Sequence, residues 1–343
     1  MEYADLPGRD ARGNWKPVAR IELPAFPRWP FRLAPFLTWL FGFPGFLWPY
    51  KAVIFGLTAV TWFFLTPPLE TMATLRPGWI ALILLRNVAL IAVWYSIFHV
   101  RLHVQRAQGL RYKFNNRWLA EKSRAFFLGG QTADNVFYSI VSGGGIWTAY
   151  EVVTLWAYAN GLLPFMAFRT SPVAFVLLFL AIPFFRAAHF YVVHRLMHWK
   201  PLYKAAHYVH HRNVNVGPWS GISMHPIESL IYFSYMFVHL IVPSHPLHAI
   251  FHLQYAGLTP ALGHTGFSKM ELGHEKAALA HGSYFHYLHH RYFECNYASD
   301  EDMFLDKLFG SMHDGTAEAH AKMRARAQTR IRARKAAAEA PLG

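Results

Sequence analysis

The most restrictive feature of this sequence is a series of apolar runs, each close to the length that crosses a bilayer. Four of them begin near residues 52, 79, 136 and 172, and two shorter ones occupy 227–242 and 247–262. A membrane-spanning helix needs about 20 apolar residues, so the pattern predicts an all-α, multi-pass transmembrane bundle. The composition agrees, because only 15% of the residues are charged, against about a quarter in soluble domains.

Basic residues lie beside these runs and give the chain a net charge of +14. They gather in the amino-terminal arm, at 101–124, at 195–212 and after 317. The positive-inside rule places such segments in the cytosol, with the 227–262 hairpin leaving and re-entering on that side. The charge therefore predicts contact with the anionic membrane surface, and no nucleic-acid partner. We expect the inner (plasma) membrane if the protein is bacterial.

The sequence divides into four parts. We expect an interfacial arm at 1–50, three spans with a basic connector at 51–171, a catalytic domain with a membrane hairpin at 172–314, and a basic tail at 315–343. Histidine motifs in the third part should form a helical cap on the cytosolic side of the bundle. We predict that its two histidine-rich stretches, 194–211 and 264–290, meet.

A metal ion in this chain would have to be bound by histidine and carboxylate, since the single cysteine, Cys295, excludes a cysteine-built site and an internal disulfide. All but four of the 21 histidines lie between His189 and His290. They include one H-x-x-x-H motif and two H-x-x-H-H motifs, made by His194 and His198, by His207, His210 and His211, and by His286, His289 and His290.

These spacings put imidazoles on one face of a helix, where they reach a common point. The eight imidazoles exceed the four ligands of a structural zinc site. Two metal ions are therefore the economical interpretation, although imidazole also suits zinc, copper and nickel as well as iron.

At these motifs the sequence resembles the fatty acid hydroxylase and sterol desaturase superfamily, over roughly 187–314. His225 and Glu228, in the segment H-P-I-E, and His264, in H-T-G, resemble further family motifs, as does the segment around Asp306. The resemblance implies two iron ions, with dioxygen as co-substrate. It implies His264 as a ninth ligand, His225 as a possible ligand, and Glu228 and Asp306 as acceptors for imidazole N–H groups.

The implied activity is hydroxylation or desaturation of an unactivated C–H bond in a membrane lipid, with a slight preference for hydroxylation. No fused haem-binding or nucleotide-binding motif occurs in the sequence, so electrons should come from a separate ferredoxin- or cytochrome b5-like protein. The basic segment 101–124 would suit an acidic carrier of this kind. The substrate lipid and the oxidised position stay open.

Two other functions stay open at this stage: a metal or proton transporter, and a structural or lipid-scaffolding protein. The remaining histidines of the region carry no motif and are expected to be structural, namely His189, His239, His245, His248, His252, His274 and His281. Arg86 and Arg186, within apolar runs, are expected to pair inside the bundle or to reach the membrane surface.

Overall fold

The computed structural model describes residues 8–15, 21, 30–43, 45–273, 278–281, 283–298 and 303–339. Within these residues the chain is mostly helical, as predicted, and the single sheet is an antiparallel ribbon of β1 (Lys269–Glu271) and β2 (Ala278–Ala280). His274 and residues 299–302 lie outside the described residues.

The helical elements follow one another with short connections. They are α1 (Leu33–Phe41), α2 (Tyr50–Phe64), η2 (Leu69–Ala73), α3 (Pro77–His99), η3 (Val100–Val104), α4 (Gln131–Tyr138), η4 (Ser139–Gly144), α5 (Gly145–Ala159), α6 (Pro172–Met197), α7 (Lys200–Leu202), η5 (Tyr203–His207), α8 (Tyr208–His211), η6 (Pro218–Ser220), α9 (Pro226–Phe233), η7 (Ser234–Leu240), α10 (Pro246–Leu258), α11 (Pro260–Gly263), α12 (Tyr284–Tyr292), α13 (Met303–Leu308) and α14 (Ala317–Glu339).

Two helices in the described part of the chain are long and apolar enough to cross a membrane. They are α3 continued by η3, at Pro77–Val104, and α6, at Pro172–Met197. Only 33% of the apolar window of the first and 28% of that of the second is buried inside the protein. Each helix therefore presents a mostly exposed apolar surface, as a lipid-facing helix does.

The other predicted spans differ from this pattern. The first is the 15-residue helix α2, and the third is a continuous helical segment in which the π-helical turn η4 joins α4 to α5. A π turn shifts the helical register, and here Gly143 and Gly144 in that turn are buried against Ile222 and Ile91. These glycines therefore allow neighbouring segments to pack closely against the turn.

The predicted hairpin also differs, because its second arm is a central helix. Every residue of α10 except Leu247 is buried. Gln254 on this helix donates to the hydroxyl of Thr61 on α2, at 2.7 Å. On another side, a Cβ at Gly257 would lie 2.4 Å from the Trp147 ring of α5, so only glycine permits this approach. Internal polar contacts and close packing thus enclose α10, where a membrane hairpin would face lipid.

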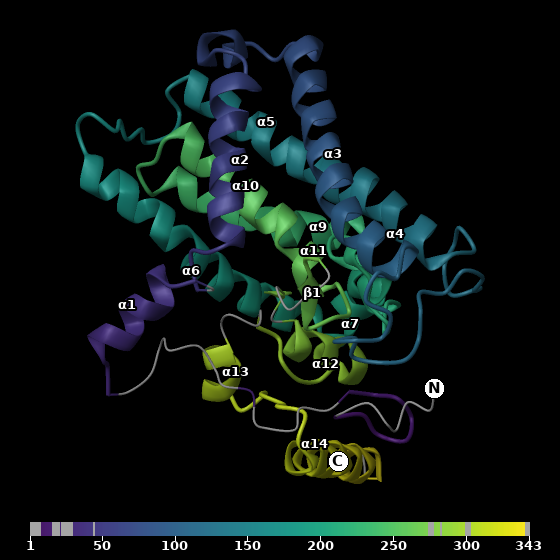
Figure 1. Cartoon of the computed structure of the whole chain (residues 1–343). Coiled ribbons are helices and arrows are strands. Elements are labelled where there is room, and N and C mark those ends of the chain that lie inside the picture. The colour runs from purple at the N-terminus through teal and green to yellow at the C-terminus, as the bar shows by residue number, and fades with distance from the viewer. Residues whose placement is uncertain are drawn as a thin grey trace.

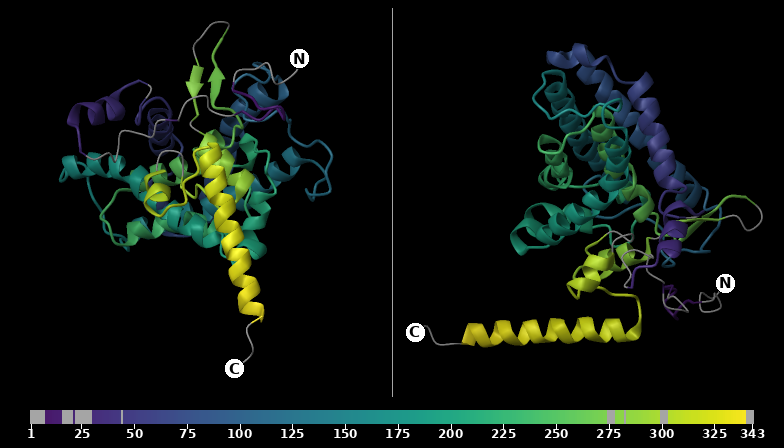
Figure 2. Two further views of the ribbon diagram at one scale, coloured as in Figure 1. Left: turned by 90° about the horizontal axis from the view of Figure 1, so that it is seen from below. Right: turned by 90° about the vertical axis from the view of Figure 1, so that its left-hand side faces the viewer.

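The segments that carry the histidine motifs gather at one end of the molecule (Figure 1), opposite the turn between α2 and α3. The end of α6, together with α8, α11 and α12, lies there. The basic segment 101–124 joins this end too, since Phe114 N donates to the Gly266 carbonyl at 3.0 Å. Helix α14 projects away from the rest of the protein (Figure 2).

Candidate metal centre

Nine histidines meet at this end in two compact groups. The five-histidine group consists of His194, His198, His207, His211 and His289, and the four-histidine group of His210, His264, His286 and His290. Within each group the facing nitrogen atoms lie within 4.8 Å of one another. The predicted meeting of the two histidine-rich stretches is therefore confirmed. These nine histidines are the residues that the sequence analysis predicts as metal ligands. Metal binding itself stays a prediction.

Each H-x-x-H-H motif divides between the two groups. In the first such motif the residues four apart, His207 and His211, join the five-histidine group, and His210 joins the other. In the second motif the assignment is reversed, because only the middle histidine, His289, joins the five-histidine group. Residues four apart in a helix point the same way, whereas their neighbour three residues from the first points about 60° aside, which sends it to the adjacent group.

Local backbone structure positions the first motif. The π-helical turn η5 ends at His207 and continues directly into α8, which carries His210 and His211. A π turn is a common feature of functional sites because it changes which side chains face inward. His194 and His198 come from the last turn and the end of α6, so the long apolar helix delivers its final residues to the centre.

Three imidazoles of the five-histidine group are oriented by hydrogen bonds from Nδ1. His207 Nδ1 lies 2.7 Å from Glu228 Oε1, and His194 Nδ1 lies 2.7 Å from the carbonyl oxygen of Tyr297. His289 Nδ1 lies 2.6 Å from the carbonyl oxygen of Cys295. Since these oxygens accept, the neutral imidazoles carry their hydrogen on Nδ1, and the lone pair on Nε2 is free to bind metal.

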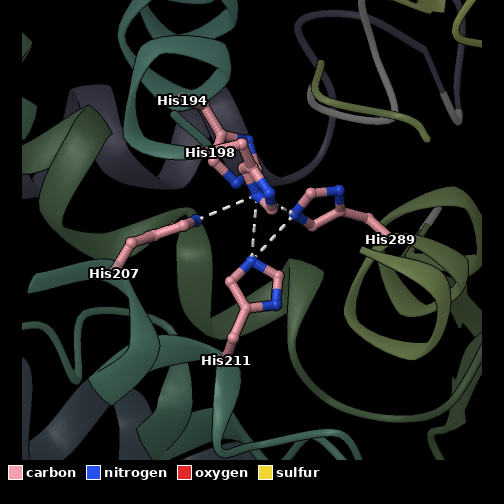
Figure 3. Close-up of side chains that lie close together, drawn as sticks. All are labelled: His194, His198, His207, His211 and His289. Carbon is pink, nitrogen blue, oxygen red and sulfur yellow. Dashed lines mark hydrogen bonds between the residues drawn. The ribbon is translucent and has the colours of Figure 1, made fainter. Parts of the chain in front are cut away.

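The Nε2 atoms of this group converge (Figure 3). His198 Nε2 lies 3.1 Å from His207 Nε2 and 3.1 Å from His289 Nε2. His289 Nε2 also lies 3.1 Å from His211 Nε2. Lone pairs that point at one another repel, and a single hydrogen on His198 satisfies few of these contacts. A bound cation among them removes the repulsion, so the donor set fits a metal ion.

The four-histidine group has the same character. His264 Nδ1 lies 2.8 Å from the Pro260 carbonyl oxygen, which again leaves the lone pair on Nε2. That Nε2 atom lies 3.0 Å from His286 Nε2 and 3.1 Å from His290 Nε2. Three imidazoles thus point their Nε2 atoms at one place, and a second cation fits there.

Burial keeps these imidazoles neutral, which is the form that binds metal. It lowers the pKa of His207 to about 3. It also lowers the pKa of His210, to about 4, although the nearby Glu228 carboxylate opposes the shift. The pKa of Glu228 itself rises to about 7 through burial, which the adjacent His210 and His225 oppose.

Glu228, His225 and Asp306, which the sequence predicts as possible or supporting residues of the centre, have different contacts in the structure. Glu228 contacts an imidazole, as expected from its predicted role. His225 lies in neither group and instead accepts from the Ile227 N–H, at 3.3 Å, at the start of α9. Asp306 accepts from the backbone N–H of Tyr297, at 3.0 Å, and of Ala298, at 2.7 Å. The expected contact of Asp306 with an imidazole is therefore not made in the described part of the chain.

The position of Asp306 has a simple physical reason. The loop that contains Cys295 and Tyr297 turns its carbonyl groups toward His289 and His194 and presents the N–H groups of Tyr297 and Ala298 to the Asp306 carboxylate. The carboxylate holds the loop, and the loop holds the histidines. Sequence reasoning had no means of finding these carbonyl acceptors, because every residue has a carbonyl group.

None of the other described histidines between His189 and His290 joins either group. Those expected to be structural and lying within the described residues are His189, His239, His245, His248, His252 and His281. His248, for example, bonds from Nε2 with the Phe175 carbonyl oxygen at 2.8 Å. Their partners are internal, as the absence of a motif predicts.

A largely apolar cavity of about 1190 Å³ reaches both groups. His194 and His207 line it from the five-histidine group, and His210, His264 and His286 from the other. Its opposite walls include aromatic residues of the amino-terminal part, Trp39, Phe46, Trp48 and Tyr50. The sequence predicts this part to lie in the membrane interface and gives no sign that it lines a cavity, because that contact depends on tertiary packing.

Comparison with known proteins is decisive for the region that carries this centre. The Fatty acid hydroxylase family matches residues 175–311. This region belongs to the fatty acid hydroxylase and sterol desaturase superfamily. All nine histidines of the two groups lie within the matched residues.

Curated relatives that this chain matches are sterol desaturases. Over 129 residues, 37% of this chain and 34% of the relative, it is 30% identical to the Delta(7)-sterol 5(6)-desaturase ERG3 of Saccharomyces cerevisiae. Over 109 residues, 31% of this chain and 33% of the relative, it is 32% identical to the Delta(7)-sterol 5(6)-desaturase ERG3B of Gibberella zeae. The similarity favours an oxidoreductase over the transporter considered from the sequence.

The chain matches about a third of the length of these relatives. No solved structure matches it. The first half of the chain, with α2, α3 and α5, thus lies outside the family match, and its arrangement comes from the structure alone.

Proposed function

We propose that the protein is a membrane-bound, dioxygen-dependent di-iron enzyme that hydroxylates or desaturates an unactivated C–H bond of a lipid. The observation that carries this proposal is the convergence of nine imidazoles on two points that border one apolar cavity. The five-histidine group would hold one iron ion, and the four-histidine group would hold the other. When bound, the two ions would supply the activation of dioxygen that such a reaction requires.

The balance of the reaction explains what the protein must provide. Hydroxylation converts R–H, dioxygen, two electrons and two protons into R–OH and water. Desaturation with the same inputs removes two hydrogen atoms from adjacent carbons and yields two molecules of water. In both cases the protein must hold the substrate carbon beside the centre, exclude bulk water and accept electrons.

The residues around the cavity suit the first two tasks. Phe190, Met197 and Met224 line it near the histidines, and their apolar side chains would bind a lipid chain and exclude water. The exposed apolar faces of α3 and α6 would place the cavity beside the hydrocarbon region, from which a lipid would enter. The histidine end, with its basic segments, would face the cytosol.

Electrons would come from a separate acidic protein, ferredoxin-like or cytochrome b5-like. Support comes from the basic segment 101–124, on which Arg106, Arg117, Lys122 and Arg124 are exposed. Charge attraction would speed the encounter of this surface with an acidic carrier. Replacing Arg117, Lys122 and Arg124 by glutamine should slow turnover at low salt and weaken its dependence on ionic strength, whereas turnover with a small chemical reductant should not change.

Comparative lipidomics tests the proposed reaction. Cells that express the full chain should contain a lipid that gains one oxygen atom or loses two hydrogen atoms, and cells that express His207→Ala at the same membrane level should lack it. Growth under labelled dioxygen distinguishes the two reactions, since only hydroxylation places the label in the lipid. An unchanged lipidome with a fully iron-loaded protein would contradict the proposal.

A further inference from the structure

Arg186 is a buried cation in the wall of the cavity. Its side chain belongs to α6, and only 6% of the residue is exposed. The guanidinium donates from Nη2 to the hydroxyl oxygen of Tyr232. That hydroxyl in turn donates to the Ala256 carbonyl oxygen, at 2.7 Å. The guanidinium has five N–H donors, so this contact satisfies a small part of its hydrogen-bonding capacity.

No carboxylate in the described part of the chain forms an ion pair with Arg186. The charge is compensated in part by aromatic rings, since the guanidinium carbon lies 4.8 Å from the ring centroid of Phe190 and 5.5 Å from that of Tyr232. Such cation–π contacts are weaker than the cost of removing a charge from water. The aromatic contacts alone therefore leave much of the desolvation cost of this charge unmet.

Arg86 provides an internal comparison. It also lies in a long apolar helix, α3, and is buried to a similar extent, with 7% exposed. Arg86, however, forms an ion pair with Glu151 of α5, and the same carboxylate accepts from Asn87 at 2.9 Å. The protein thus supplies an internal anion for the buried arginine that is closed off in the bundle. The arginine that faces the cavity has none.

The position of Arg186 relates it to the metal centre. Arg186, Phe190, His194 and His198 are spaced four residues apart and share one face of α6. Arg186 and His194 both line the cavity, and eight residues of helix separate their Cα atoms by about 12 Å along the axis. One wall of the cavity therefore carries a cation at one place and metal-binding imidazoles at another, with an aromatic ring between them.

Two lysines in the described lining add to its positive charge. Lys51 and Lys269 line it as well, and the Lys51 ammonium nitrogen lies 3.9 Å from the centroid of the Phe46 ring. Among the described residues that line the cavity the one carboxylate is Glu228, which is already bonded to His207. A ligand hydroxyl would accept a hydrogen bond from Arg186 but leave its charge uncompensated. A carboxylate or a phosphate would accept the hydrogen bond and also compensate the charge.

We propose that Arg186 binds the anionic headgroup of the lipid substrate, a carboxylate or a phosphate, while the apolar chain extends along α6 to the histidine groups. The inference rests on the proposed function, because it takes the cavity as the substrate site. It adds that the substrate is a lipid with an anionic headgroup and that oxidation occurs on its apolar chain, well away from the headgroup.

Equilibrium binding to the purified full chain in detergent tests the inference without turnover. The probes are tritiated palmitate, hexadecyl phosphate and hexadecanol, which share a chain length and differ in the headgroup. Charge-assisted hydrogen bonds should make the anionic probes bind about 10- to 100-fold more tightly than hexadecanol. The tighter of the two anionic probes then identifies the headgroup as carboxylate or phosphate.

Arg186→Gln should reduce the affinity for the anionic probes to that for hexadecanol and leave hexadecanol binding unchanged. Arg186→Lys should retain part of the preference, since an ammonium keeps the charge but not the planar pair of donors. The matched control is Arg195→Gln, which removes the same charge from an exposed position of the same helix. It should not change binding of any probe.

Equal binding of palmitate, hexadecyl phosphate and hexadecanol to the unaltered protein would overturn the inference, even if Arg186→Gln failed to fold. Unchanged binding of the anionic probes to folded Arg186→Gln would also overturn it, because Arg186 would then be held by its aromatic contacts alone. Since binding is measured without iron or electrons, a failed activity assay does not affect this result. If product forms but the three probes bind equally, the anionic headgroup is refuted and the proposed function stands.

Discussion

The two histidine groups use the same type of ligand, yet the protein supports them differently. In the five-histidine group the acceptors for Nδ1 include the carboxylate of Glu228, and in the four-histidine group His264 donates to a neutral carbonyl. Each group also contains an imidazole whose Nδ1 has no hydrogen-bond partner in the described residues, namely His211 in the first and His290 in the second, so the carboxylate is what distinguishes them. A carboxylate behind an imidazole raises its basicity and fixes its orientation. We therefore expect the five-histidine group to bind metal more tightly.

The groups also differ in their relation to the cavity. Three of the four members of the four-histidine group line it, namely His210, His264 and His286, against His194 and His207 of the other group. The better-supported group is thus set further back, and the less-supported group borders more of the substrate space. This difference indicates a division between holding metal firmly and leaving room for reactants.

The largest effect is expected from removing one ligand from each group at neighbouring positions of α12. His289→Ala should empty the five-histidine group and His290→Ala the four-histidine group, because the two side chains belong to different groups. Each variant should lose product formation, and its iron content should fall from about two ions per chain to about one. Elemental analysis of the purified protein and lipid product analysis measure both. Full iron content in either variant would contradict the division into two sites.

The carboxylate provides a way to sharpen the comparison. Glu228→Ala should weaken metal binding in the five-histidine group about 10- to 100-fold and leave the other group unchanged. Competition with a chelator, followed for each of the two ions, measures the affinities. Glu228→Gln keeps an acceptor for His207 Nδ1 without the charge. Its metal affinity should lie between those of the unaltered protein and Glu228→Ala. If both ions were weakened equally, the carboxylate would not distinguish the groups.

A smaller effect is expected at Asp306, which acts through the loop. Asp306→Ala leaves the buried N–H groups of Tyr297 and Ala298 without their acceptor and should lower the free energy of unfolding by about 1–3 kcal/mol. The loosened loop should also lower metal retention by His194 and His289. Denaturant unfolding in detergent and metal retention test this. Tyr297→Phe is the control, since it keeps the backbone carbonyl, and an equal loss in that variant would argue against the loop mechanism.

The smallest effect is expected at His225, which caps α9 outside both groups. His225→Ala removes the acceptor for the Ile227 N–H and should cost about 1 kcal/mol or less of stability. Iron content and product formation should stay at the level of the unaltered protein. The variant thereby serves as the non-ligand control for the α12 substitutions. Loss of one iron ion in His225→Ala would assign it to the centre after all.

Much of the site is predictable from sequence because helix geometry is local. Spacings of three and four residues put the imidazoles of each motif on neighbouring faces of a helix, whatever the rest of the chain does. Long-range packing is not predictable in this way. Three apolar runs became exposed helices at α3 and α6 and an enclosed helix at α10, because Gln254 and Gly257 of α10 find partners on α2 and α5.

The sequence by itself determined the set of nine histidines, their ligand type and the absence of cysteine ligands, since these follow from residue identity and local spacing. Only the tertiary structure decided how the set divides into groups of five and four. Folding also decided that loop carbonyls orient His194 and His289, and that Arg186 faces a cavity without an internal anion. Most of these features depend on contacts between segments distant in the chain, and backbone carbonyl acceptors leave no residue pattern in the sequence.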